Sequence, residues 1–130
     1  MTNEEELEKI CQKIIKMDLK IRSARIINSR GHLVAGGMKQ GLQSLESQKQ
    51  DEMMFMELAL RVRMRHEFDK EFGEVHFSMS YRDKVIVMSF PLAEDGVLLV
   101  STEKEADFGK IAFKILKLIA PLKKSVLGTF

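Results

Sequence analysis

The sequence has few of the residues and segments that mark secreted or membrane proteins. Cys11 is its one cysteine, so no disulfide can form within the chain. No segment approaches the roughly 20 apolar residues that a membrane span requires. Residues 1–9 are acidic and lack the basic and then apolar pattern of a signal peptide. We therefore expect a cytoplasmic protein without membrane insertion, in which Cys11 is a small buried side chain.

Strong charge of one sign is also lacking. The formal net charge of +2 is too small to indicate nucleic-acid binding by itself. The most basic run, 61–66, has no Phe, Tyr or Trp between its arginines to stack on bases. Helical spacing places Arg61 and Arg65 on one face, where Glu57 can pair with Arg61. We predict a solvated helix face here and no nucleic-acid partner.

Residues for catalysis, metal binding and phosphate binding do not occur in the patterns that these functions need. His32, His66 and His76 have no second ligand at the spacing of a helical metal site. Cys11 falls on the buried face of a predicted helix, and the serines of the predicted strands lie in mid-strand rather than on a strained elbow. No Gly-rich loop precedes a Lys-Ser or Lys-Thr pair. We predict a non-enzyme without a metal or cofactor.

The sequence does contain enough apolar residues for one self-sufficient domain. Hydrophobic residues make up 45% of the chain and charged residues 31%, which is the ordinary range for a globular protein. Folding a chain of this length buries roughly two-thirds of its unfolded surface. We expect residues 1–130 to form a single domain, with 122–130 as a flexible tail.

Three successive apolar runs, 75–81, 85–90 and 97–102, predict a meander of antiparallel strands joined by short polar turns. The first run alternates apolar with small polar residues. The other two are nearly continuous apolar runs, which are typical of strands covered on both faces. Helices are therefore expected on both sides of the sheet.

The first half of the chain predicts a helix and a hairpin. Apolar residues recur at helical spacing over 3–19. Residues 21–28 and 33–37 predict two strands, and the turn between them contains Gly31. The stretch 39–50 is rich in Gln, Ser and Gly and predicts a long exposed connection.

Two further helices are predicted, over about 51–68 and after Asp107, which can cap the last one. Pro121 is expected to end that last helix. The middle helix has two apolar stripes, one made of Met53, Met56, Leu60 and Met64, the other of Phe55, Leu58, Ala59 and Val62. Packing on one sheet face needs only one stripe, so the surplus near Met53 and Met54 predicts a subunit or partner contact.

The order helix, strand, strand, helix, three strands, helix resembles the roadblock family, the dynein light chain type of small αβ domain. The resemblance spans about 4–122 and is clearest in the first hairpin, 26–34, and in 97–101 before the last helix. It implies an α+β fold of three layers. A five-stranded antiparallel sheet would carry the middle helix on one face and the two terminal helices on the other.

Members of the roadblock family are non-enzymatic, dimerise through the middle helix and the third strand, and act as scaffolds or regulators for small Ras-like GTPases or motor complexes. The resemblance therefore implies a homodimer with a protein partner such as a small GTPase. Mapped onto this sequence, the dimer or partner interface comprises Met53, Met54, Phe55, Val75, His76, Phe77, Ser78, Met79 and Tyr81.

The residues themselves also favour a dimer. In the predicted meander, 75–81 is a free edge, and it has none of the Lys or Pro residues that usually prevent an edge strand from pairing. The alternative function is a small-molecule sensor of the PAS or profilin kind, with an apolar pocket under the middle helix.

Overall fold

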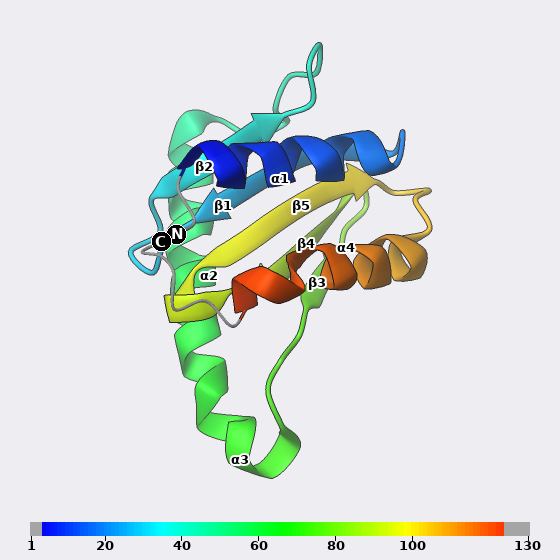
Figure 1. Ribbon diagram of the computed structural model, residues 1–130. Helices are drawn as coiled ribbons and strands as arrows, with labels where there is room; N and C mark the ends of the chain where they lie inside the picture. Colours follow the sequence, from blue (N-terminus) through cyan, green and yellow to red (C-terminus); the bar gives the residue numbers. More distant parts are fainter. Residues whose placement is uncertain (1–3, 124–130) are drawn as a thin grey trace.

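The computed structural model describes residues 4–123, and a five-stranded antiparallel sheet forms their middle layer (Figure 1). The strands lie in the order β2-β1-β5-β4-β3. Their bounds are β1 Ile21–Ile27, β2 Leu33–Met38, β3 Ser78–Tyr81, β4 Val85–Pro91 and β5 Val97–Glu103. The predicted meander is confirmed, because β3, β4 and β5 are neighbours, and β2 and β3 form the two edges.

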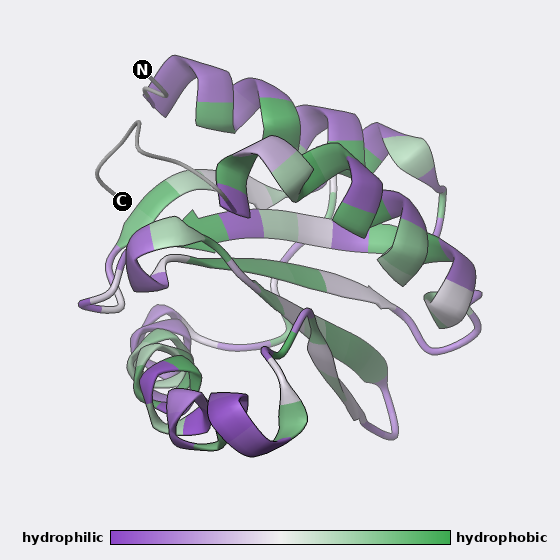
Figure 2. Cartoon of the chain, turned by 60° about the horizontal axis from the view of Figure 1, so that its bottom comes forward, coloured by the Kyte–Doolittle hydropathy of each residue, from purple (hydrophilic) through white to green (hydrophobic). Residues whose placement is uncertain are grey.

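Helices cover both faces of the sheet, and the predicted α+β fold of three layers is confirmed. Figure 2 shows α1 and α4 together on one face, with α2 on the other. The bounds are α1 Glu4–Met17, α2 Gln48–Arg65, α3 Asp69–Phe72 and α4 Phe108–Lys123, with short 3-10 turns at His66–Phe68 and Ala93–Asp95. No helix among residues 4–123 is both long and apolar enough to span a membrane.

The main core lies between the sheet and the α1/α4 pair. Because side chains alternate along a strand, every second residue of the central strands enters this core. From β4 these are Ile86, Met88 and Phe90, all fully buried. The α4 side chains that meet them are Ile111, Ala112, Ile115, Ile119 and Leu122.

A smaller core lies between the sheet and α2. It contains the opposite side chains of the same strands, Ile27, Val97 and Leu99, together with Phe55 and Val62 from α2. The continuous apolar runs of the meander are thus explained, because β5 contributes residues to both cores.

The third strand of the sheet is shorter than the sequence predicts. Only Ser78–Tyr81 pairs with β4, so the prediction that residues 75–77 belong to the strand was wrong. Ser78 pairs with Ser89, and continuing this register would place His76 opposite Pro91. Proline has no N–H to donate to a ladder, so the pairing stops short of it.

Helix boundaries also differ from the predicted ones. Helix α2 begins at Gln48 rather than Asp51, because Ser47 accepts a hydrogen bond from the Gln50 backbone N–H and the Gln50 side chain accepts one from the Ser47 N–H. At the other end of the chain, Asp107 caps α4 as predicted, whereas Pro121 lies inside the helix rather than ending it.

Only the first two residues of the tail predicted over 122–130 belong to the described part of the chain. Leu122 is buried in the main core and Lys123 is the last residue of α4, so neither belongs to a tail. Residues 124–130 lie outside the described part of the chain.

Candidate protein-interaction site

Helix α2 has an apolar stripe on its outer side as well as on its buried side. Phe55, Ala59 and Val62 pack against the sheet. The outer side chains are between 50% and 70% exposed, and they are Met53, Met56, Leu60 and Met64. We call these four residues the outer stripe. A helix that only covered a sheet would carry polar residues there.

The outer stripe faces away from the β3 edge. Arg65 donates a hydrogen bond of 2.6 Å to Ser78 Oγ, which shows that this side of α2 faces β3. Met56 lies about two and a half turns before Arg65 and is therefore on the opposite side of the helix. The Met56 backbone packs against Gly31 in the β1-β2 hairpin, so close that a Cβ at Gly31 would lie 3.1 Å from it. The outer stripe and the β3 edge are thus two separate surfaces.

The structure brings part of the predicted interface to the surface around β3. Met79 and Tyr81 are exposed on β3, and Ser78 is half-buried beneath Arg65. Met54 is also half-buried, at the margin of the smaller core. Met53 is exposed, but on the outer stripe.

Phe55 was wrongly placed on a surface. It is only 6% exposed, because its ring packs in the smaller core and beneath the Arg25 guanidinium at 5.1 Å. Val75 and Phe77 are half-buried in the segment before β3, and His76 accepts a hydrogen bond from Lys123 Nζ at 3.0 Å.

A buried ion cluster, which the sequence analysis missed, fixes the start of α2. The Arg25 side chain on β1 is almost fully buried and reaches Asp51 at 3.0 Å and Glu46 at 3.4 Å. Burial, and then the hydrogen bond with Glu46, raise the pKa of Asp51 to about 6. The same hydrogen bond lowers the pKa of Glu46. The cluster therefore holds the connection before α2 against the sheet.

Two sequence signals could have revealed this arrangement. Arg25 is a charge in the middle of a strand, at a position whose neighbours Ser23 and Ile27 are buried on the same face. Ser47 and Gln50 have the spacing of a capping box, which indicates a helix start within the supposed loop.

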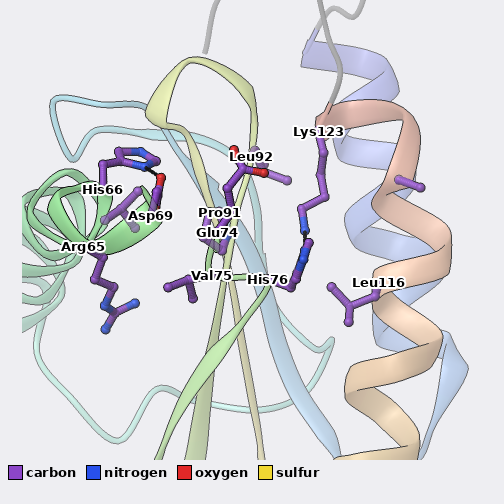
Figure 3. Close-up of a pocket in the computed structure, with 12 residues that line it drawn as sticks. Arg65, His66, Asp69, Glu74, Val75, His76, Pro91, Leu92, Leu116 and Lys123 are labelled. Carbon is purple, nitrogen blue, oxygen red and sulfur yellow. Dashed lines mark hydrogen bonds and ion pairs between the residues drawn. The ribbon is translucent and has the colours of Figure 1, made fainter. Parts of the chain in front are cut away.

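A cleft of about 430 Å³ lies under the last turn of α2, between it and α4 (Figure 3). Six of the described residues that line it are apolar, and none is a Ser, Thr or Cys. The lining residues are Val62, Arg65, His66, Asp69, Glu74, Val75, His76, Pro91, Leu92, Leu116, Ala120 and Lys123. The sensor alternative would place its ligand at this end of the middle helix.

His66, one of the lining residues, joins the end of α2 to the turn between β4 and β5. Its Nδ1 lies 2.7 Å from Asp69 and its Nε2 lies 2.9 Å from Asp95, so the protonated ring can donate to both carboxylates. These hydrogen bonds, first the one with Asp69, raise the pKa of His66. Asp95 and the preceding Glu94 have positive φ angles of 60° and 58°. His66 thus contacts a strained turn between β4 and β5 through Asp95.

Other candidate chemistry is absent from the described residues. Within residues 4–123, no three His, Cys, Asp or Glu side chains are grouped to hold a metal ion. Cys11 is fully buried, and burial, followed by the charge of Glu8, raises the pKa of its thiol to about 12. The thiol is therefore protonated at neutral pH, as predicted from its place on the helix.

The sequence matches, over residues 1–128, the model of a family of unknown function (DUF6659). The chain belongs to this family. No curated protein has a matching sequence.

Several solved structures have the same fold at low sequence identity. A roadblock/LC7 domain from Streptomyces avermitilis is 14% identical, with a TM-score of 0.65 over 88% of this chain and 94% of that one. MglB from Myxococcus xanthus is 16% identical, with a TM-score of 0.69 over 91% and 92%. An MglB described as having a tetrameric arrangement is 11% identical, with a TM-score of 0.72 over 92% and 89%. The chain therefore has the roadblock fold that its element order predicted.

Proposed function

We propose that this protein is a non-catalytic regulatory or scaffold module that homodimerises and binds a protein partner. The observation that carries the proposal is the outer stripe of α2, which stays at least half exposed although it is as apolar as the buried side. Contiguous exposed apolar residues on a folded domain mark interaction surfaces. Three of the four are methionines, whose flexible side chains adapt to a partner's shape.

The homodimer uses the β3 edge. Neither Pro nor Lys interrupts β3, and no described residue pairs with the outer side of this strand. A second copy that pairs antiparallel with β3 satisfies the free backbone groups and extends the sheet across a two-fold axis. Met54, on the β3 side of α2, lies beside this contact, as do Ser78 and Tyr81.

The protein partner binds the outer stripe. Because the stripe faces away from β3, it stays open when two copies pair through their edges. The partner class that the roadblock resemblance implies is a small Ras-like GTPase. Each dimer then offers two such surfaces related by the two-fold axis.

The dimer is tested by light scattering on a sizing column at micromolar concentration. We expect about twice the chain mass of 14.9 kDa. Ser80→Glu should lower the mass, because it puts a charge into the strand pair and makes two like charges diagonal neighbours across the two-fold axis. Leu33→Glu puts the same charge on the β2 edge and should leave the mass unchanged. A wild-type monomer at every concentration would contradict the proposal.

The partner surface is tested with Leu60→Glu, which charges the middle of the outer stripe. Wild-type and variant proteins are used as bait in native lysate with GTP or with GDP, and retained proteins are identified by mass spectrometry. Wild type should retain a small guanine-nucleotide-binding protein that Leu60→Glu loses while remaining a dimer. Lys13→Glu, on the exposed side of α1, is the matched control. Equal retention by both variants would show that the outer stripe is not the docking surface.

A further inference from the structure

An aromatic patch lies on the α4 face of the sheet, beside the β3 edge. Met79 and Tyr81 pair with Met88 and Ile86, which are buried in the main core, so their side chains point to the α4 face. The Phe77 ring packs between the buried Phe90, at 5.8 Å, and Phe113 of α4, at 6.0 Å. We call Phe77, Met79, Tyr81 and Phe113 the aromatic patch.

The aromatic patch is left open by the single chain. Tyr81 is 60% and Phe113 61% exposed, and the Lys104 ammonium lies above the Tyr81 ring at 5.6 Å. Helix α4 packs mainly over β4. The patch therefore continues the β3 edge as an apolar surface.

We propose that a second copy of this chain covers the aromatic patch, with the two β3 strands paired about Met79 so that Phe77 and Phe113 of each copy pack against Tyr81 of the partner subunit. This inference rests on the homodimer proposed above. It adds the register of the two strands and a contact on the face opposite α2.

The alternation of side chains restricts the register. Antiparallel pairing of a strand with its own copy places the two-fold axis perpendicular to the sheet, so both α4 helices lie on the same face. Directly opposed residues must then point to the same face. An axis at Met79 places Phe77 opposite Tyr81 of the partner subunit. An axis at Ser80 would leave Phe77 beyond the paired residues. An axis midway between Met79 and Ser80 would place Met79 opposite Ser80 of the partner subunit, and these two side chains point to different faces of the sheet.

The spacing of the two helices leaves room for aromatic side chains and little else. With α4 over β4 in each copy, about three strand spacings of 4.8 Å, or roughly 14 Å, separate the helix axes. Helices in direct contact are about 8–10 Å apart. The remaining gap of roughly 5 Å matches side chains such as Phe113 and excludes another helix.

The β3 edge alone offers too little area for a stable dimer. A strand of four residues spans only about 13 Å, and its backbone pairing covers a small part of the roughly 800 Å² per partner that a stable dimer needs. Each Phe or Tyr side chain can bury about 150–250 Å². The aromatic patch is the exposed apolar surface that adjoins the edge on the α4 face.

The register is tested by cysteine cross-linking of the full chain. Met79→Cys places two thiols opposite each other across the axis, and mild oxidation should convert most of the protein to a covalent dimer. Ser80→Cys should cross-link about tenfold more slowly, because Ser80 then faces Ser78 of the partner subunit. Leu33→Cys on the β2 edge is the control, and Cys11 is fully buried and does not compete. Faster cross-linking of Ser80→Cys than of Met79→Cys would overturn the proposed register.

The aromatic contact is tested by dilution of the dimer, followed by light scattering. Phe113→Ser should raise the dissociation constant at least about tenfold, as expected for a buried aromatic anchor. Leu19→Ser is the control, because Leu19 is 91% exposed in the turn before β1, three strands away from β3. A wild-type dissociation constant for Phe113→Ser would overturn the contact while leaving the homodimer intact. A monomeric wild type would instead refute the homodimer itself.

Discussion

The two faces of the sheet differ in how completely the apolar side chains of their helices are buried. On the α1/α4 face, 20 buried residues form one cluster, and α1 presents charged residues outward. On the α2 face, five buried residues form the smaller core, and the outer side of the helix is apolar. The first face accounts for most of the folding energy, because burial of apolar area drives folding. On the second face, apolar side chains of α2 remain exposed.

The two sheet edges differ in the same way. On the β2 edge, the Gly36 N–H donates to Glu8 of α1 at 2.8 Å, so a helix side chain occupies the edge. Gly36 has a φ of 90°, and a Cβ there would lie 2.1 Å from the Ala24 carbonyl oxygen, so the strand is distorted as well. Both features prevent pairing with another chain. The β3 edge has neither, and the contrast favours β3 as the dimer edge.

The largest effect should come from the α1/α4 face. Ile115→Ala should lower the free energy of unfolding by roughly 2–5 kcal/mol, because Ile115 is fully buried and its loss leaves a cavity. Leu60→Ala on the outer stripe should change it by no more than about 0.5 kcal/mol. Urea denaturation monitored by circular dichroism measures both. Equal losses would mean that the outer stripe contributes to the fold as much as the main core does.

A smaller effect should come from the ion cluster that anchors α2. Arg25→Met keeps an apolar stem over Phe55 but leaves Asp51 and Glu46 without their counter-charge. The free energy of unfolding should fall by roughly 1–3 kcal/mol, because both carboxyls are only partly exposed. Hydrogen exchange should show the loss mainly in residues 44–55.

Asp51→Asn provides the control for the ion cluster. In the Asp51→Asn background one of the two carboxylates is gone. Arg25→Met should therefore lower the free energy of unfolding by less than it does in the wild type. Additive costs would show that Arg25 and Asp51 do not interact in the folded protein.

Patterns repeated along the chain were enough to predict most of the fold. The apolar spacing of 97–102 and of α4 is local, and it predicted the central strands and the position of the last helix. The short third strand could not be predicted this way, because its end depends on Pro91 in the neighbouring strand. The Arg25 cluster depends on the approach of Glu46 and Asp51, which only the folded chain brings together.

The candidate site was predicted less completely than the fold. Two apolar stripes on one helix predicted that some apolar side chains of this helix would stay exposed in the folded chain. The exposure of the outer stripe confirms this prediction. Which stripe would face β3 depends on the rotation of α2 about its axis. The contacts of Arg65 with Ser78 and of Met56 with Gly31 set that rotation, and the sequence pattern does not contain it.

The smallest expected effect is a pH dependence confined to the α2 face. His66 joins the end of α2 to the turn between β4 and β5, with a carboxylate beside each ring nitrogen. The folded state therefore favours the protonated ring, and hydrogen bonds with Asp69 and then Asp95 raise its pKa above the ordinary 6.5. A raised pKa stabilises the fold fully below pH 6.5, and the contribution is lost as the pH rises through the higher folded-state value.

His66→Gln should therefore lower the melting temperature at pH 6 and have progressively less effect as the pH is raised toward 9. The shift should be small, because half of the His66 side chain is exposed and solvent screens its ion pairs. Hydrogen exchange at pH 6 should locate the loss at the end of α2 and in the β4-β5 turn, with α1 unchanged. Asp95→Asn removes one of the two acceptor carboxylates. It should therefore cause part of the same loss of melting temperature at pH 6. If His66→Gln shifts the melting temperature equally at pH 6 and pH 9, the ring contributes by packing rather than by charge, and the two faces respond alike to pH.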